Sequence, residues 1–125
     1  MGLYLSRLEL KARIHVGKEA EQWLSHAEEG EYTVIKWLYL VQEDRHRYSV
    51  TYLESFDEGD EGWQLVPEFS LLDPNAEERT VFDSVEEAVA YAVQAYGASP
   101  DRFVPEGMLV QEYARYWQSK NASAK

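Results

Sequence analysis

The sequence predicts an α+β fold, in which an antiparallel β-meander sheet carries its helices on one face and residues 1–120 form a single domain. Two patterns support this prediction. Apolar residues recur at helical spacing between Ser84 and Tyr96, and the segment from Tyr32 to Gln42 is apolar on both alternating faces, as in a central strand. Because a helix with one apolar stripe needs an apolar surface to cover, we expect the two to pack together. Residues 121–125 are expected to form a frayed tail.

Both ends of the 84–96 helix are marked in the sequence. Ser84, with Glu87 three residues later, matches a capping box, and Gly97 can adopt the left-handed conformation that ends a helix. The preceding residues, Arg79–Phe82, have the composition of a strand. We expect the helix to pack on the sheet that contains the 32–42 strand through the side formed by Val85, Val89 and Val93.

Two segments near the N-terminus have different periodicities. Leu8–Val16 alternates strictly between apolar and polar residues, which predicts a strand with one solvated face. In Lys18–Glu29 the apolar residues fall at i, i+3, i+4 and i+7, and Gly30 follows, which predicts a short amphipathic helix.

The remaining elements complete the predicted meander. The polar run 43–47 is typical of a hairpin turn, and Pro67 favours an edge or a bulge because it cannot donate to a strand ladder. The other predicted elements are, in chain order, a returning strand over Tyr48–Phe56, a third strand over Trp63–Leu72, a loop over Ala98–Gly107 and a last amphipathic helix from Leu109 to Trp117.

Composition restricts the classes of partner. The 125 residues include no cysteine and carry a formal net charge of −11. The lack of cysteine excludes disulfides, thiolate metal ligands and thiol nucleophiles, and it fits a cytoplasmic protein. No run approaches the ~18 apolar residues of a membrane span, so we expect no membrane partner. A phosphate backbone would be repelled, so we expect no nucleic acid; cations and basic protein surfaces are the expected partners.

The sequence has no local signature of an enzyme. It contains no G-x-S-x-G, no H-E-x-x-H and no glycine-rich phosphate loop. The three histidines, His15, His26 and His46, fall in three different predicted elements. We therefore expect a protein without enzymatic activity.

The most unusual feature is an acidic segment in the middle of the chain, since no Lys or Arg occurs between Arg47 and Arg79. Within it, a glycine-containing loop between two predicted strands holds four carboxylates, Asp57, Glu58, Asp60 and Glu61. Two carboxylates about 5 Å apart repel by roughly 3 kcal/mol at an effective dielectric of about 20. Ca²⁺ would relieve this repulsion, and it takes several oxygen ligands in flexible geometry. The four residues are therefore candidate calcium ligands, with a solvated hairpin tip as the alternative interpretation.

The loop does not match an EF-hand. Counting from Asp57 places Gly62 at the sixth and Glu68 at the twelfth position of that motif, but the third position is Gly59 and the flanks are predicted strands. Residues Asp73–Glu77 offer a second set of oxygen side chains, and they also suit a turn.

In size, acidity and the run Asp57–Glu61, the chain resembles the small acidic calcium-binding protein of heterocyst-forming cyanobacteria, which has no EF-hand. The resemblance implies a calcium buffer or signalling component that binds through surface carboxylates and has no enzymatic activity.

An interaction module is the alternative function. The segment Phe82–Ala88 is similar to the strand-to-helix turn of small antitoxin domains of the HicB type. This similarity implies an antitoxin-like or inhibitor-like domain, whose acidic surface would bind a basic protein partner.

Overall fold

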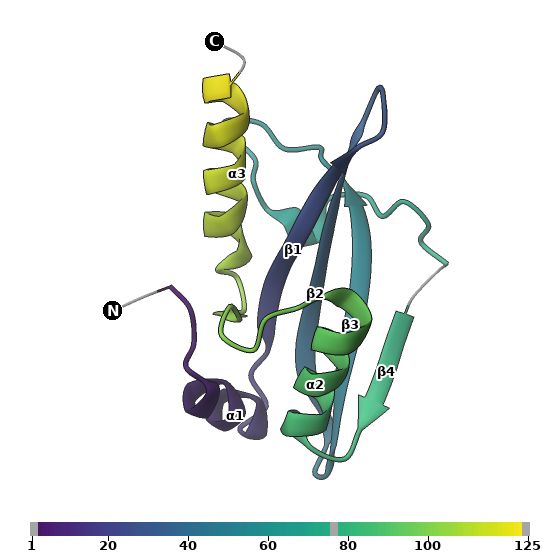
Figure 1. Ribbon diagram of the computed structural model, residues 1–125, viewed down its shortest axis with the longest axis vertical. Helices are drawn as coiled ribbons and strands as arrows, with labels where there is room; N and C mark the ends of the chain where they lie inside the picture. The colour runs from purple at the N-terminus through teal and green to yellow at the C-terminus, as the bar shows by residue number, and fades with distance from the viewer. Residues whose placement is uncertain (1–2, 76–77, 124–125) are drawn as a thin grey trace.

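The computed structural model describes residues 3–75 and 78–123, which form a five-stranded antiparallel sheet and three α-helices (Figure 1). In chain order the elements are α1 (Arg7–His15), β1 (Ala20–Glu28), β2 (Thr33–Asp44), β3 (Arg47–Phe56), the 3₁₀ turn η1 (Val66–Glu68), β4 (Glu78–Phe82), α2 (Val85–Tyr96), β5 (Val104–Pro105) and α3 (Leu109–Ser123). The strand order is β4-β3-β2-β1-β5, so β1 to β4 form a meander and β5 lies beside β1. The predicted α+β fold with an antiparallel meander sheet is confirmed.

The central strand β2 supplies a core on each face of the sheet. Leu38 and Leu40 belong to one apolar cluster, together with buried residues of α1 and α2. Ile35 and Trp37 belong to a second cluster with η1 and α3. Successive side chains of a strand point to opposite faces, so α1 and α2 share one face whereas α3 covers part of the other. Of the two predicted helices that the structure contains, α2 lies on the predicted common face with the unpredicted α1, whereas α3 packs on the opposite face.

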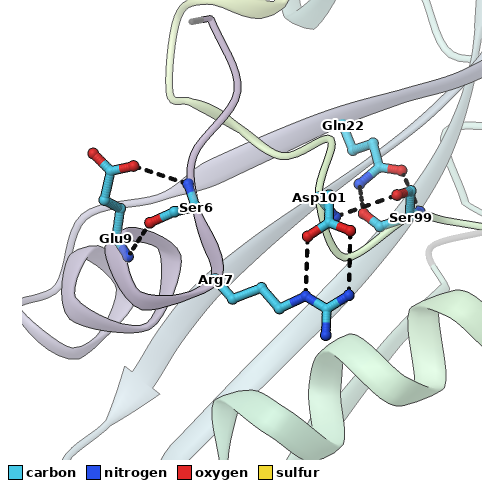
Figure 2. A network of polar contacts seen from close by, with 6 residues as sticks. All are labelled: Ser6, Arg7, Glu9, Gln22, Ser99 and Asp101. Carbon is cyan, nitrogen blue, oxygen red and sulfur yellow. Dashed lines mark hydrogen bonds and ion pairs between the residues drawn. The ribbon is translucent and has the colours of Figure 1, made fainter. Parts of the chain in front are cut away.

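The first predicted strand, Leu8–Val16, is instead helix α1. Ser6 and Glu9 form a capping box (Figure 2), in which Ser6 Oγ accepts from the Glu9 amide at 3.1 Å and Glu9 Oε1 accepts from the Ser6 amide at 2.9 Å. Leu10 and Ile14, four residues apart, are the buried side chains of the helix. A spacing of four fits a helix as well as an alternating strand, and the cap decides between them.

The predicted helix Lys18–Glu29 is instead strand β1, because its start is covered on both faces. Polar residues are buried at this start, so the segment lacks the alternation of apolar and polar residues by which a strand is recognised. Gln22 exchanges two hydrogen bonds of 2.8 Å with the backbone of Ser99 (Figure 2), and Glu21 is only 4% exposed. The register of β1 against β2 shifts between Trp23 and Ser25.

Both predicted ends of α2 are confirmed, but its buried side differs in part. Ser84 Oγ accepts from the Glu87 amide at 3.1 Å, and Gly97 is left-handed with φ of 71°. The buried side chains are Val85, Ala88 and Ala92, and the helix lies over β3 and β4. Val93, which was predicted to face the sheet, is 39% exposed and lines a groove between α1 and α2 with Val89.

Two further segments differ from their predictions. Trp63–Leu72 contains the short η1 in place of a strand, with Pro67 in its first turn, and only Leu71 bridges to β3, through Ser55. The predicted loop Ala98–Gly107 includes the two-residue β5. Helix α3 continues through Ser123, past the start of the predicted tail; residues 124–125 lie outside the described part of the chain. Among the described helices, none is long and apolar enough to span a membrane.

The buried face of α2 leads to a stability prediction. Ala92 is fully buried, so Ala92→Asp places an unpaired carboxylate in the core and should cost about 3 kcal/mol. Gln94→Asp introduces the same side chain at an exposed position of the same helix and serves as the control. Thermal melts followed by circular dichroism should show a large decrease in melting temperature for Ala92→Asp and a small one for Gln94→Asp. Equal melting temperatures would contradict this placement of α2.

Candidate functional site

The acidic loop after β3 is tied to α3 by Asp57, whose side chain is 3% exposed. The Tyr113 hydroxyl donates to Oδ1, and the Tyr116 hydroxyl donates to Oδ2 at 2.9 Å. Lys120 Nζ lies 3.3 Å from Oδ2, and the Gly59 amide donates to Oδ1 at 3.2 Å. Donors from both the helix and the loop therefore occupy both oxygens of this carboxylate.

Burial alone would raise the pKa of Asp57, but the hydrogen bonds from Tyr113 and Tyr116 and the charge of Lys120 outweigh it and lower this pKa. Burial and the neighbouring carboxylate raise the pKa of both tyrosine hydroxyls, which stay protonated as donors. A carboxyl with a lowered folded-state pKa stabilises the fold above its unfolded-state pKa, and this stabilisation is lost as pH falls through the folded-state value. Asp57 is therefore a structural link at neutral pH.

The other three predicted calcium ligands point to separate places. Glu58 Oε1 accepts from the Ser70 amide at 2.6 Å, and Asp60 Oδ1 accepts from the Gly62 amide at 2.7 Å. Glu61 is exposed. Of the second predicted set, Asp73 Oδ1 accepts from the Asn75 amide at 3.0 Å, while Ala76 and Glu77 lie outside the described residues.

Within residues 3–75 and 78–123, no three His, Asp or Glu side chains are arranged to hold one metal ion. The structure thus does not bring Asp57, Glu58, Asp60 and Glu61 together around one point. Calcium binding by this loop stays a prediction from the sequence.

A different acidic site lies on the sheet face that carries α3. We call it the β1 pocket, a cavity of about 370 Å³. Its floor is aromatic and aliphatic, and three carboxylates stand around it. The lining residues are Glu19, Glu21, Trp37, Tyr39, Leu53, Pro67, Leu71, Glu106 and Gly107.

Backbone pairing brings the three carboxylates of the β1 pocket together from distant parts of the chain. The Glu106 amide donates to the Glu19 carbonyl at 3.2 Å, next to the pairing of β1 with β5. Glu21 Oε1 accepts from the amides of Gly107 at 3.1 Å and Leu109 at 3.4 Å, at the entry to α3. None of the hydrogen bonds formed by the described residues reaches Glu21 Oε2.

The carboxylates of the β1 pocket repel one another. Burial raises the pKa of Glu21, and the charges of Glu106 and Glu19 raise it further, against the lowering effect of the two amides. Burial, followed by the charge of Glu106, raises the pKa of Glu19. Carboxyl groups with shifted pKa values in one cavity are typical of binding or catalytic sites. A cationic ligand would reduce the repulsion between their charges.

A second cavity adjoins the first and shares Tyr39, Leu53 and Leu71 with it. We call it the β3 pocket; its volume is about 230 Å³. Among the described residues it is lined by three carboxylates. Two of them, Glu54 and Glu78, belong to the face of the sheet that carries α2, where they accept from the hydroxyls of Tyr52 and Tyr96. The lining residues are Tyr39, Thr51, Tyr52, Leu53, Glu54, Leu71, Leu72, Asp73, Pro74 and Glu78. The two pockets together are called the acidic groove below.

The β3 pocket contains a polar atom that the fold leaves unpaired. Thr51 is 1% exposed, and its Oγ1 has no hydrogen-bond partner among the described residues. A buried hydroxyl without a partner costs about 1–3 kcal/mol, so this position lowers the stability of the fold.

Sequence reasoning missed the acidic groove for identifiable reasons. Glu19 and Glu21 fell in a segment predicted as a helix, and Glu106 fell in a predicted loop 85 residues from Glu21. In a strand, Glu19, Glu21 and Trp23 point to the same face, so a correct strand assignment would have shown two acids beside an aromatic ring.

Comparisons of this chain with protein-family models, with curated proteins and with solved structures find no match. The resemblance to the cyanobacterial calcium-binding protein and the similarity to HicB-type antitoxins therefore stay predictions.

The Asp57 link leads to a pH-dependent prediction. Asp57→Asn keeps the shape but removes the charge, and it should cost about 2 kcal/mol at pH 7, as expected for hydrogen bonds to a charged group. The deficit should shrink as pH falls below the unfolded-state pKa of about 3.9, because wild-type Asp57 then becomes neutral too. Urea unfolding at several pH values measures this, with Asp60→Asn as the exposed control. A deficit that stays constant with pH would contradict an ionic role.

Proposed function

We propose that this protein is a non-enzymatic interaction module that binds a basic segment of a partner protein in the acidic groove. One observation supports this proposal above the others: two adjoining cavities are each lined by three carboxylates, and neither is lined by a Lys or Arg of the described residues. A concave site with an apolar floor and a few convergent charged groups is the usual form of a ligand site.

The spacing of the carboxylates favours an organic cation over a metal ion. The charge of Glu106 reaches both Glu19 and Glu21 and raises the pKa of each, yet within the described residues no three such groups can hold one metal ion. A lysine ammonium or an arginine guanidinium is larger than a metal ion, and it carries donors that can reach separate carboxylates. The ligand that matches these groups is a basic side chain.

The floor of the β1 pocket suits the aliphatic stem and charge of such a side chain. Trp37 Nε1 donates to Ser55 Oγ at 3.0 Å, which fixes the indole ring, and the Tyr39 ring lies beside it with centroids 6.1 Å apart. Aromatic faces attract a cation, by about 0.5–1 kcal/mol at exposed sites. Apolar contact and charge therefore act on the same ligand.

The net charge of −11 supports a basic protein segment as the partner. A strongly acidic surface accelerates the approach of basic ligands and repels acidic ones, and the effect weakens as salt screens it. The groove then adds orientation, because its two pockets accept charge only at defined positions.

The first test uses a short peptide of alternating lysine and serine and its counterpart with acetylated lysines, titrated by calorimetry. We expect saturable binding of the first and at least roughly tenfold weaker binding of the second, since acetylation removes the charge. The double variant Glu19→Gln with Glu106→Gln should lose affinity to a similar degree. The matched control is Glu29→Gln with Glu31→Gln, two exposed carboxylates at the opposite end of β1.

The proposal is wrong if the lysine peptide does not bind, or if both double variants weaken it equally. Equal loss would mean that only net charge matters. Calcium chloride and sodium chloride at matched ionic strength complete the design, because a calcium-specific heat in the absence of peptide would instead support the predicted loop site at Asp57–Glu61.

A further prediction separates function from stability at Glu21. The folded-state pKa of this carboxyl is raised, so its ionised form at pH 7 opposes folding; this unfavourable effect decreases as pH falls through the folded-state pKa and is absent below the unfolded-state value. Glu21→Gln retains an oxygen that can accept from Gly107 and Leu109, so its melting temperature at pH 7 should equal or exceed that of wild type. Its peptide affinity should nevertheless fall by roughly tenfold. A variant that is less stable and still binds normally would assign Glu21 a structural role only.

A further inference from the structure

We infer that two copies of this chain form a two-fold symmetric dimer through the groove between α1 and α2, called here the α1–α2 groove. Helices α1 and α2 share one side of the sheet, whereas the β1 pocket lies on the side that carries α3 (Figure 1). The dimer interface and the proposed peptide site are therefore separate surfaces, and this inference goes beyond the proposed function.

The α1–α2 groove is a cavity of about 590 Å³ with a mainly apolar lining. Its deepest residues, Leu10 of α1 and Val85 of α2, belong to the core on this side of the sheet. Val89 and Ala90 continue the apolar surface along α2 toward solvent. A surface helix normally buries its whole apolar stripe, so these two helices leave part of their stripes without a cover.

Two large apolar side chains are exposed where they border the α1–α2 groove. Leu8 of α1 is 78% exposed, and Val93 of α2 is 39% exposed. Single exposed apolar residues are normal on a protein surface, but these two are continuous with the concave apolar surface of Val89 and Ala90. A contiguous apolar patch with charged residues around it is typical of a protein–protein interface.

This surface is complementary to itself in shape. It carries an exposed leucine side chain, Leu8, and beside it an apolar cavity. In a two-fold interface the same patch of both copies takes part, so each contact occurs twice. If Leu8 of one copy packs against Val89 and Val93 of the other copy, symmetry places the second Leu8 in the first groove. The capping box of Ser6 and Glu9 holds the turn that carries Leu8.

The charges around the α1–α2 groove favour a second copy of this acidic chain. Arg7 pairs with Asp101 at 2.9 Å (Figure 2), and Lys11 pairs with Glu86 at 2.8 Å, so bases and acids balance at the rim. Residues 1–18 hold four of the twelve Lys and Arg residues but only one of the twenty-three Asp and Glu residues. Two chains of net charge −11 therefore repel each other least where these surfaces meet.

The rim charges also fix how the two copies face each other. The wall from α1 contributes the bases Arg7 and Lys11, and the wall from α2 contributes the acid Glu86. When α1 of one copy faces α2 of the other, opposite charges meet at both ends of the interface. The pair of Lys11 and Glu86 within one chain is exposed and contributes little to stability, so each side chain can exchange its partner for one in the other copy. A basic peptide gains no such attraction from a rim without net charge.

The experiment is sedimentation equilibrium of the full-length protein from micromolar to millimolar concentration, where wild type should show a reversible monomer–dimer equilibrium. Leu8→Gln should raise the dimer dissociation constant by about tenfold for each copy, and so by about a hundredfold in total, because each leucine loses an apolar contact. The matched control is Val16→Gln, which removes an apolar side chain of 67% exposure that does not line the α1–α2 groove. Neither substitution changes the net charge.

Cysteine cross-linking tests the arrangement directly, because the natural chain contains no cysteine. A mixture of Leu8→Cys protein and Val93→Cys protein should form disulfide-linked pairs under mild oxidation, since the dimer places these two positions in contact. A mixture of Val16→Cys and Val93→Cys proteins is the control and should link far less, because a disulfide forms only between closely placed residues.

Three outcomes would overturn the inference. Wild-type protein that stays monomeric at millimolar concentration would leave the α1–α2 groove to a different partner. A dimer that Leu8→Gln and Val16→Gln weaken equally, or equal cross-linking in the two mixtures, would place the interface elsewhere. Thermal melts of dilute protein should show Leu8→Gln folded, since Leu8 is mostly exposed in one copy. Leu8→Gln should also bind the lysine peptide as wild type does, so the inference and the proposed function fail independently.

Discussion

The architecture depends on one constraint: the central strand β2 is apolar on both faces, so the sheet needs a cover on each side. Helices α1 and α2 meet this need on one face, where Leu38 and Leu40 are fully buried. On the other face, η1 and α3 cover Ile35 and Trp37 but leave Tyr39 and Leu53 only half-buried. The β1 pocket lies over this uncovered part of the sheet, so it results from the incomplete cover of the second face.

Two buried carboxylates show how the same chemical group takes opposite roles. Asp57 accepts from two tyrosine hydroxyls, an amide and a lysine, and its pKa is lowered; the fold is complementary to its charge. Glu21 accepts two amide hydrogen bonds on one oxygen beside other carboxylates, and its pKa is raised. A fold that leaves a buried charge incompletely compensated sacrifices stability there, which is characteristic of sites selected for binding. The Asp57 carboxylate therefore stabilises the fold, whereas Glu21 Oε2 keeps acceptor capacity for a ligand.

Elements whose caps or apolar patterns are local to the segment could be predicted from the sequence; elements fixed by distant partners could not. The helix from Val85 to Tyr96 was predicted because its caps are local, and the central hairpin because its apolar pattern is long. The first two elements were exchanged, because Leu10 and Ile14 fit both periodicities and because Glu21 and Gln22 are buried through partners from residues 99–109. The groove requires pairing between β1 and β5, which are about 80 residues apart in the chain. Contacts between such distant segments produce no periodic pattern of apolar residues, so they could not be predicted from the sequence.

Acidity alone does not distinguish a calcium protein from a protein that binds basic segments, because both require excess carboxylates. Geometry does distinguish them. A calcium ion needs six to eight oxygens at about 2.3–2.6 Å from one point, whereas a lysine side chain needs an apolar wall for its stem and acceptors spread around its tip. The loop carboxylates Asp57, Glu58 and Asp60 are each directed to different donors of the protein itself. The carboxylates of the β1 pocket, Glu19, Glu21 and Glu106, stand around an aromatic floor, which is the arrangement that a basic side chain requires.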